Sequence, residues 1–422
     1  MFALIDCNSF FCSVEKVFHP GLEGRPVVVL SSNDGCIVAL TPEAKRLGLR
    51  RGNPIFQVRD VVREGQVTVF STNMPLYAAM SRRITSILRQ SLYHVENYSI
   101  DESFCDLRGY ERLHDLENLM RSVADKIRLW TDIPVSVGIA PTKTLAKVAN
   151  KFAKKHNGYR GVCIIDSDEK RRKALSLSEL GDVWGIGRNT LSHLHYLGLS
   201  TPLELADKNE QWVRAHLHKP GLQTWHELNG RPCIDTTEVL RHQSICTSRS
   251  FGTMISDRDS LKASVAGFAA SCANRLRGQH SGAKTITVFI HSNSFRDDLP
   301  QYAQAETHTF LTPTDDTLEI TRAALEIVDR IYRPGIHYKK SGVILGEIEA
   351  IDRLQLSLFD PIPNRAERSA LMKTIDRLNH RYGPKTIRLS AEGGDDQAWK
   401  VKCDHRSSNY LTDINEILTV RI

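Results

Sequence analysis

Hydrophobic and polar positions follow two alternating patterns through the first 165 residues. Short apolar runs bounded by turn residues predict buried β-strands, and amphipathic segments with helical spacing lie between them. The expected strands are 2–6, 26–32, 95–107, 133–140 and 161–166, and the expected helices are 8–15, 42–48, 77–90, 114–130 and 143–155. This alternation predicts an α/β or α+β domain.

The pattern changes near residue 166. Residues 175–230 contain short helical segments separated by glycines, which predict a small helical domain. From 243 to 349 the predicted order is strand, helix, strand, strand, helix, strand, which is a split β-α-β-β-α-β unit. Residues 351–422 are polar and turn-rich, with Pro361 and Pro363 near their start.

Composition narrows the class of protein. The 422 residues are 41% hydrophobic and 25% charged, as in globular proteins, and the length predicts two to four domains. Nine cysteines are scattered without a Cys-x-x-Cys pair, so neither a zinc site nor a disulfide framework is predicted. Apolar stretches are interrupted by charges, and the N-terminus lacks the features of a signal peptide. We therefore expect an intracellular protein without a membrane segment.

Basic residues are slightly in excess and gather in one segment. The net charge of +7 is compatible with a polyanionic partner. Lys143, Lys147, Lys151 and Lys155 recur every four residues, so a helix over this segment would carry a basic stripe. A solvated helix face explains such a stripe equally well.

Three acidic residues stand next to apolar segments. Asp6 ends the first predicted strand, and Asp101 and Glu102 lie within a second apolar segment. Neighbouring residues of a regular strand point to opposite faces, so both acids reach one place only at a bend or hairpin tip. Carboxylates that gather in a cleft repel one another unless cations neutralise them, and Mg²⁺ suits such ligands. The acids alone fit either a metal site or a surface turn.

Three segments carry a resemblance to a known family. FALIDCNSFFCSVE at 2–15, YSIDESFCDL at 98–107 and SVGIAPTKTLAKVANKFAKK at 136–155 resemble the three palm motifs of the Y-family translesion DNA polymerases, in order and spacing. Within this family the chain is similar to the UmuC group, the catalytic subunits of bacterial DNA polymerase V and their plasmid-borne relatives. The likeness runs from residue 1 into the C-terminal tail.

The resemblance implies an α+β multidomain fold, shaped as a right-hand polymerase. Its parts would be a palm, small fingers, a helical thumb with a helix-hairpin-helix, and a β-α-β-β-α-β little finger. The implied boundaries are 1–10 and 74–165 for the palm, 11–73 for the fingers, 166–232 for the thumb, 233–243 for a linker, 244–350 for the little finger and 351–422 for a C-terminal extension.

The resemblance also assigns the metal site. Asp6 and Asp101 would bridge two Mg²⁺ ions, Glu102 would hold the ion that activates the primer 3′-hydroxyl, and the Cys7 carbonyl would be a further ligand. Two such ions stabilise the attacking and leaving oxygens of phosphoryl transfer.

The nucleotide site follows in the same way. Phe10 and Phe11 would lie against the incoming nucleotide, with Phe11 as the steric gate that excludes a ribose 2′-hydroxyl; a core aromatic is the alternative. Lys45 and Lys154 would bind the triphosphate. Pro42 stands where the family has a tyrosine, which puts the contacts of the fingers in doubt, and Lys45 replaces an arginine and loses its bidentate fork.

DNA contacts are expected in two places. Gly185, Gly187 and Arg188 lie in a segment that resembles the family's helix-hairpin-helix, where backbone N–H groups bind phosphate without reading sequence. Simple helix punctuation is the alternative for these glycines. Arg249 and Lys284 lie on predicted strands of the little finger and would face the phosphates of primer-template DNA.

The C-terminal extension is expected to bind proteins. Gln355, Leu356, Leu358 and Phe359 match the peptide by which bacterial polymerases dock on the sliding clamp, and residues 364–422 resemble a tail that engages a UmuD′-like dimer and RecA. Such apolar side chains beside prolines suit a hydrophobic groove better than a core strand.

The function implied is error-prone, template-directed DNA synthesis from dNTPs past lesions in the SOS response, without proofreading, in the bacterial cytoplasm at the nucleoid. One alternative is a non-catalytic DNA-binding scaffold with the same fold. Another is a palm that serves a different acceptor, as in nucleotide cyclases or a specialised dCMP transferase.

Overall fold

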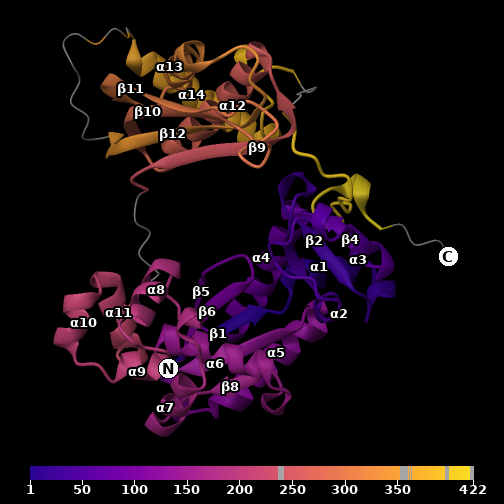
Figure 1. Cartoon of the computed structure of the whole chain (residues 1–422), viewed down its shortest axis with the longest axis vertical. Helices are drawn as coiled ribbons and strands as arrows, with labels where there is room; N and C mark the ends of the chain where they lie inside the picture. The colour runs from indigo at the N-terminus through magenta and orange to yellow at the C-terminus, as the bar shows by residue number, and fades with distance from the viewer. Residues whose placement is uncertain (236–241, 352–359, 361, 363, 395–398, 419–422) are drawn as a thin grey trace. The chain divides into compact units, whose positions relative to one another are not determined.

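The computed structural model describes residues 1–235, 242–351, 360, 362, 364–394 and 399–418, and Figure 1 shows the course of the chain. The chain divides into two compact units. The first comprises Met1–Ser31, Gly35–Val239 and Asp404–Ile422, and the second comprises Ser32–Asp34 and Leu240–Cys403. Each unit has its own hydrophobic core and is described by itself.

A five-stranded mixed sheet lies at the centre of the first unit. The strand order is β5 (His94–Asn97), β6 (Glu102–Asp106), β1 (Phe2–Cys7), β7 (Val135–Ala140) and β8 (Val162–Ile164). The first strand of the chain, β1, is antiparallel to both β6 and β7, while β7 and β8 are parallel. The N-terminal motif therefore occupies the middle of the sheet.

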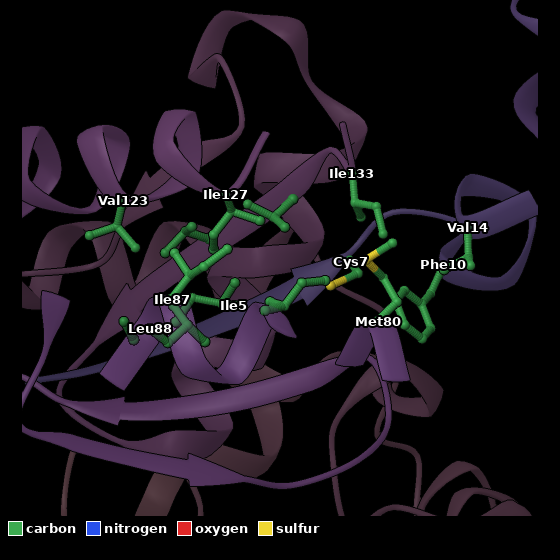
Figure 2. Close-up of a cluster of buried hydrophobic side chains, with 14 of the residues drawn as sticks. Ile5, Cys7, Phe10, Val14, Met80, Ile87, Leu88, Val123, Ile127 and Ile133 are labelled. Atoms are coloured by element: carbon green, nitrogen blue, oxygen red, sulfur yellow. The ribbon is translucent and has the colours of Figure 1, made fainter. Parts of the chain in front are cut away.

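Side-chain alternation along β1 separates its two faces. Ala3, Ile5 and Cys7 enter a core shared with helices α4 (Met74–Ser91) and α5 (Leu116–Thr131), part of which is drawn in Figure 2. Leu4 packs on the opposite face with helix α6 (Lys143–Lys155). Since alternate residues of a strand share a face, Asp6 lies on the same face as Leu4, toward α6.

A glycine lets α6 approach the sheet closely. At Gly138, on β7, an added Cβ would lie 2.1 Å from the backbone oxygen of Ala146 in α6. Any larger residue would push α6 away from β1 and β7, and with it the lysines that α6 carries toward the acids.

A smaller sheet belongs to the same unit. Its strands are in the order β3 (Ile37–Leu40), β2 (Val27–Leu30) and β4 (Thr68–Ser71). The accompanying helices are α1 (Phe10–Phe18), α2 (Pro42–Arg46) and α3 (Arg59–Glu64). Helix α1 contacts both β2 and α4, so it joins the two sheets.

The helical segment after β8 is confirmed by the structure. It contains α7 (Asp168–Ser176), α8 (Arg188–Tyr196), α9 (Pro202–Ala206), α10 (Glu210–His216) and α11 (Lys219–Leu228). Leu175, Leu194 and Leu228 pack in a core that is continuous with α6. The palm-like sheet and these helices thus share one hydrophobic cluster.

The second unit has the predicted β-α-β-β-α-β order. Its sheet is arranged as β11 (Ala303–Thr314), β10 (Ser281–Ser292), β12 (Tyr338–Ala350) and β9 (Ile245–Ile255). Helices α12 (Arg258–Gly278) and α13 (Thr317–Ile331) cover one face of this sheet (Figure 1). Because β12 separates β9 from β10, and β10 separates β11 from β12, both strand-helix-strand units are split.

Two sequence-based expectations were wrong in detail. The single strand expected over 95–107 is two strands, β5 and β6, separated by a bend. The polar tail contains an 18-residue helix, α14 (Arg365–Tyr382). Met372 is the buried residue of α14, and ion pairs hold the helix, including Arg277 with Asp376 at 2.6 Å. A helix held mainly by charges leaves little hydrophobic period to detect.

None of the helices in the described part of the chain is long and apolar enough to cross a membrane.

Candidate active site

Pairing between β1 and β6 places two of the three acids side by side. Asp6, near the end of β1, lies directly opposite Glu102, the first residue of β6. Directly opposed residues of antiparallel strands point their side chains to the same face, about 5 Å apart. The register therefore brings together two carboxylates that are far apart in the sequence.

A bend before β6 adds the third acid. The Ser99 hydroxyl accepts hydrogen bonds from the backbone N–H groups of Asp101 and Glu102, at 3.2 and 3.0 Å. It also donates a hydrogen bond to the Asp101 carboxylate, at 2.6 Å. The Asp101 carbonyl accepts the N–H of Cys7 at 2.9 Å, which ties the bend to the end of β1. Asp101 thus lies in a bend directly before β6, as convergence with Glu102 would require.

Two lysines of α6 neutralise the acids. The Lys154 ammonium lies 2.5 Å from the Asp6 carboxylate. The Lys147 ammonium lies 2.9 and 3.0 Å from the two carboxylate oxygens of Glu102, and 4.6 Å from the centre of the Tyr98 ring. Each acid of the cross-strand pair thus has its own ammonium group from the same helix.

This arrangement corrects the interpretation of the lysine repeat. Lys143 is 5% exposed and pairs with Glu96 at 2.7 Å, and Lys151 pairs with Asp182. Together with Lys147, these side chains compensate acids of neighbouring elements. The repeat is therefore not a uniform stripe: Lys143 is buried, whereas Lys151 and Lys155 are exposed.

The pKa of Asp6 reflects its surroundings. The pKa is raised from 3.8 to about 6: burial is the largest cause, Lys154 opposes it, and the negative charges of Glu102 and Asp101 add to it. The three acids are therefore electrostatically coupled, and an added cation near Asp6 would favour its ionised form.

The donor set fits a hard divalent cation. Carboxylate oxygens are the ligands that Mg²⁺ prefers, and the negative charges of the three acids reinforce one another at Asp6. Within the described residues, no three His, Cys, Asp or Glu side chains lie close enough to hold a metal ion as they stand. The side chains of Lys147 and Lys154 compensate the acids in this arrangement, as a metal ion would.

The two adjacent phenylalanines differ in their surroundings. Phe10 is 3% exposed and packs in the core, while Phe11 is half-buried. The Phe11 ring is stacked on Tyr77 of α4, with ring centres 4.5 Å apart and planes inclined by 15°. Phe11 is therefore partly accessible, as a steric gate requires, whereas Phe10 is part of the core.

The predicted triphosphate residues of the fingers lie on α2. Pro42 is the first residue of α2, directly after the capping Thr41, whose hydroxyl accepts the N–H of Ala44. Lys45 is exposed. The proline starts a short helix, and this helix presents Lys45 to solvent.

The helix-hairpin-helix that is predicted to bind the DNA backbone requires a glycine at position 185. Gly185 has φ +96°, and an added Cβ would lie 2.3 Å from the Thr224 hydroxyl oxygen. Gly187 caps the N-terminus of α8, and Arg188 is its first residue; both are exposed. The N–H groups at the start of α8 are therefore open to an anion.

The remaining predicted contacts fall in or near the second unit. Arg249 is exposed on β9, and Lys284 is half-buried where the pairing of β10 with β11 is irregular. Gln355, Leu356, Leu358 and Phe359 lie outside the described residues. The DNA and clamp contacts of these six residues stay predictions.

Sequence reasoning missed four residues that shape the site. Ser99 holds the bend, and Lys147 neutralises Glu102. Glu15 accepts a hydrogen bond from the hydroxyl of Tyr77, whose ring stacks on Phe11. Ser99, Lys147 and Glu15 lie inside the quoted motifs, so their positions were available as a signal. The contacts of Glu15 and Tyr77 join residues far apart in the sequence and leave no local pattern.

Comparison with known proteins matches most of the chain. The sequence pattern of the impB/mucB/samB family fits residues 5–151, that of its C-terminal domain fits 242–358, and DUF4113, a domain of unknown function, fits 369–420. UmuC of Salmonella typhimurium is 40% identical and covers 100% of both chains. DNA polymerase IV of Methanoculleus marisnigri is 30% identical over 76% of this chain and 87% of its own.

A solved structure shares the fold. It is a Y-family DNA polymerase chimera of Dbh and Dpo4, which aligns with a TM-score of 0.63 over 82% of this chain and 99% of its own, at 22% identity. These relatives and the shared fold together show that the chain is a DNA polymerase of the Y family. It belongs to the impB/mucB/samB family, as the resemblance to the UmuC group predicted. Polymerases of this family depend on divalent metal ions.

Proposed function

We propose that the chain extends a primer on damaged template DNA during the DNA damage response, using Asp6, Asp101 and Glu102 as its catalytic acids. The observation that supports this most is the cross-strand pair of Asp6 and Glu102, with Asp101 added by the bend at Ser99. Palm, thumb and little finger elements accompany this site in the order of the polymerase family. The chain's acids would hold and orient the reacting groups.

Two Mg²⁺ ions, when bound, would stabilise the charge that develops on the attacking and leaving oxygens. Asp6 and Asp101 would hold both ions, Glu102 and the Cys7 carbonyl would complete the set, and Lys154 would turn from Asp6 to the triphosphate. Lys154 is one-third exposed and lies at the C-terminal end of α6, so its long side chain has room to turn. Lys45 would bind the triphosphate from the fingers.

Phe11 would exclude ribonucleotides by occupying the space that a 2′-hydroxyl needs. Its stacked position on Tyr77 supports this role, because a gate must resist displacement by the sugar. Replacing Phe11 by Ala should raise ribonucleotide incorporation while leaving dNTP incorporation within a few-fold. Unchanged sugar discrimination would show that Phe11 only packs the core.

DNA would be held through its backbone. Gly185, Gly187 and Arg188 would bind phosphates at the start of α8, and Arg249 and Lys284 would add contacts from the little finger. Each such contact would make the salt dependence of binding steeper by about one unit.

The extension would bring protein partners. We expect Gln355–Phe359 to dock on the sliding clamp, and residues 364–422 to engage a UmuD′-like dimer and RecA, in the cytoplasm at the nucleoid. Replacing Leu358 and Phe359 by Ala should abolish clamp binding while leaving distributive synthesis intact. Retained clamp affinity would remove this peptide from the proposal.

Primer extension across an abasic site tests the function as a whole. The full chain, with its accessory proteins and Mg²⁺, should add nucleotides opposite and beyond the lesion, and Asp101→Ala should not. Offering the four dNTPs separately opposite each template base distinguishes a general polymerase from a dCMP transferase. If the wild type adds no nucleotide in the full reaction, a DNA-binding scaffold replaces the enzyme.

A further inference from the structure

A second buried carboxylate lies near the nucleotide site but outside the acid site. Glu15 of α1 is 0% exposed. Its Oε1 accepts hydrogen bonds from the Tyr77 hydroxyl at 2.6 Å and from the Ser407 hydroxyl at 3.0 Å. Its Oε2 is buried without a hydrogen-bond partner among the described residues. Each of the two hydroxyl donors therefore matters for keeping this carboxylate in place.

One of the two donors comes from the C-terminal tail. His405 pairs with Ser71 at the end of β4, by hydrogen bonds of 2.9 Å in both directions. The Asn73 side-chain amide donates to the carbonyl and the hydroxyl of Ser407, at 2.9 and 3.1 Å. In Figure 1 this part of the tail runs beside β2 and β4 of the first unit.

An aromatic contact anchors the tail further along. Tyr410 stacks on Phe18 of α1 with ring centres 4.8 Å apart, and its hydroxyl lies 3.3 Å from His19. The segment from His405 to Leu411, which we name the tail strap, is thus fixed on both sides of Ser407. Backbone hydrogen bonds, side-chain hydrogen bonds and a ring contact all fix the tail strap at the same place on the first unit.

The strap reaches the predicted steric gate through two side chains. Phe11 and Glu15 are one helical turn apart on α1, so they share a face of the helix. Tyr77 is held by Glu15 at its hydroxyl and stacks its ring on Phe11. Ser407, Glu15, Tyr77 and Phe11 therefore form a continuous series of contacts from the tail to the sugar-binding side.

We propose that the tail strap is a positioning element of the nucleotide site, in which Ser407 fixes Glu15 and Tyr77 and thereby sets the position of the Phe11 ring. Ser407 is a positioning residue and touches no substrate. This inference rests on the proposed role of Phe11 as the gate. It gives the segment around Ser407 in the tail a part in selecting deoxyribonucleotides.

Loss of the Ser407 hydroxyl has a defined physical consequence. Glu15 would keep a single donor while remaining buried, so it would shift or take up a proton. The Tyr77 hydroxyl would then lose a fixed acceptor, and its ring would tilt more freely beneath Phe11. Sugar discrimination should suffer more than the rate of dNTP incorporation, because the acids and lysines of the active site are untouched.

The test compares ribonucleotide and deoxyribonucleotide incorporation by the full chain on primer-template DNA. We expect Ser407→Ala to lower the ratio of kcat/KM for dNTP over rNTP by roughly tenfold, the usual effect of one lost buried hydrogen bond. The change should lie mainly in the KM and kcat for rNTP. An equal loss for both sugars would overturn the proposal, because it would indicate a purely structural role.

Matched variants separate positioning from folding. Ser407→Thr keeps the hydroxyl and should restore discrimination. Ser408→Ala makes the same change one residue further, where the backbone carbonyl accepts from Asn73, and should leave the ratio unchanged. Discrimination that falls equally in Ser408→Ala would contradict a specific role of Ser407.

Coupling to Tyr77 provides a second, independent measurement. Tyr77→Phe keeps the ring and removes the hydroxyl, so it should lower the same ratio, and combining it with Ser407→Ala should add little. Fully additive losses would show that the two residues act separately and would refute the series of contacts.

Phe11→Ala in the same assay distinguishes the two proposals. If Phe11→Ala changes discrimination and Ser407→Ala does not, the gate stands and the inference about the strap fails. If Phe11→Ala leaves discrimination unchanged, the proposed gate itself is wrong.

Discussion

Two buried carboxylates of the first unit, Asp6 and Glu15, are stabilised by different kinds of partner. Asp6 is paired with the Lys154 ammonium at 2.5 Å and coupled to two further acids. Glu15 is held by two hydroxyl groups, those of Tyr77 and Ser407. Burial raises the pKa of both carboxyl groups above their ordinary values.

The difference between these partners indicates different roles. An ammonium on a flexible stem can move away when another cation arrives, so the environment of Asp6 is suited to exchange. Hydroxyl groups fixed by a stacked ring and a docked tail segment give Glu15 a constant geometry. We interpret Asp6 as a ligand and Glu15 as a structural anchor.

Replacing each carboxylate in turn by its neutral amide should give the largest difference in kcat between two variants. Asp6→Asn should lower kcat about a thousandfold or more, since a lost metal ligand costs several kcal/mol of transition-state stabilisation. Glu15→Gln keeps an acceptor for Tyr77 and should leave kcat for dNTP within a few-fold. Steady-state primer extension measures both, and comparable losses in the two variants would abolish the distinction.

A specific role of Lys154 in binding the triphosphate can be distinguished from the general positive charge of α6. Lys154→Ala should raise the KM for dNTP by about ten- to a hundredfold, because one charge-assisted contact to the triphosphate is lost. Lys155→Ala removes the neighbouring exposed lysine of the same helix and should leave the KM nearly unchanged. Equal effects would attribute the loss to the overall charge of α6.

The pH dependence of stability provides a smaller test. The folded chain holds the Asp6 proton with a pKa of about 6, against an ordinary value of 3.8. This carboxyl group therefore contributes most to stability below pH 3.8, and the contribution is lost as pH rises through about 6.

Asp6→Asn lacks this titration. In chelator, the free energy of unfolding of the wild type should fall by about 1–2 kcal/mol relative to the variant between roughly pH 4 and pH 7. Chemical denaturation across this range measures the difference, and a constant offset between the two proteins would show that Asp6 has an ordinary pKa.

Local patterns allowed much of the fold to be predicted. Strands and helices with clear periods, such as those over 2–6 and 114–130, appear in the structure as β1 and α5. The bend that ends at Asp101, directly before Glu102, was expected from the geometry of a strand. Helix α14 was missed because ion pairs hold it and it buries little hydrophobic surface, which leaves a weak hydrophobic period.

Long-range contacts set the limit of prediction for the site. The lysines of α6 were visible as a spacing, but their acid partners come from β1, β6 and other elements. The contact between Ser407 and Glu15 joins opposite ends of the chain. A single sequence contains the residues of such pairs but not the folding that brings them together.

We propose that Asp6, Asp101 and Glu102 form one metal-binding catalytic site. Electron paramagnetic resonance of Mn²⁺ bound to the full chain, with primer-template DNA and a non-hydrolysable dNTP, tests it most directly. We expect two spin-coupled ions per chain in the wild type and loss of the coupled pair in Asp101→Ala. A wild type without the coupled pair, or an Asp101→Ala variant that retains it, would show that the three acids do not form a shared two-metal site.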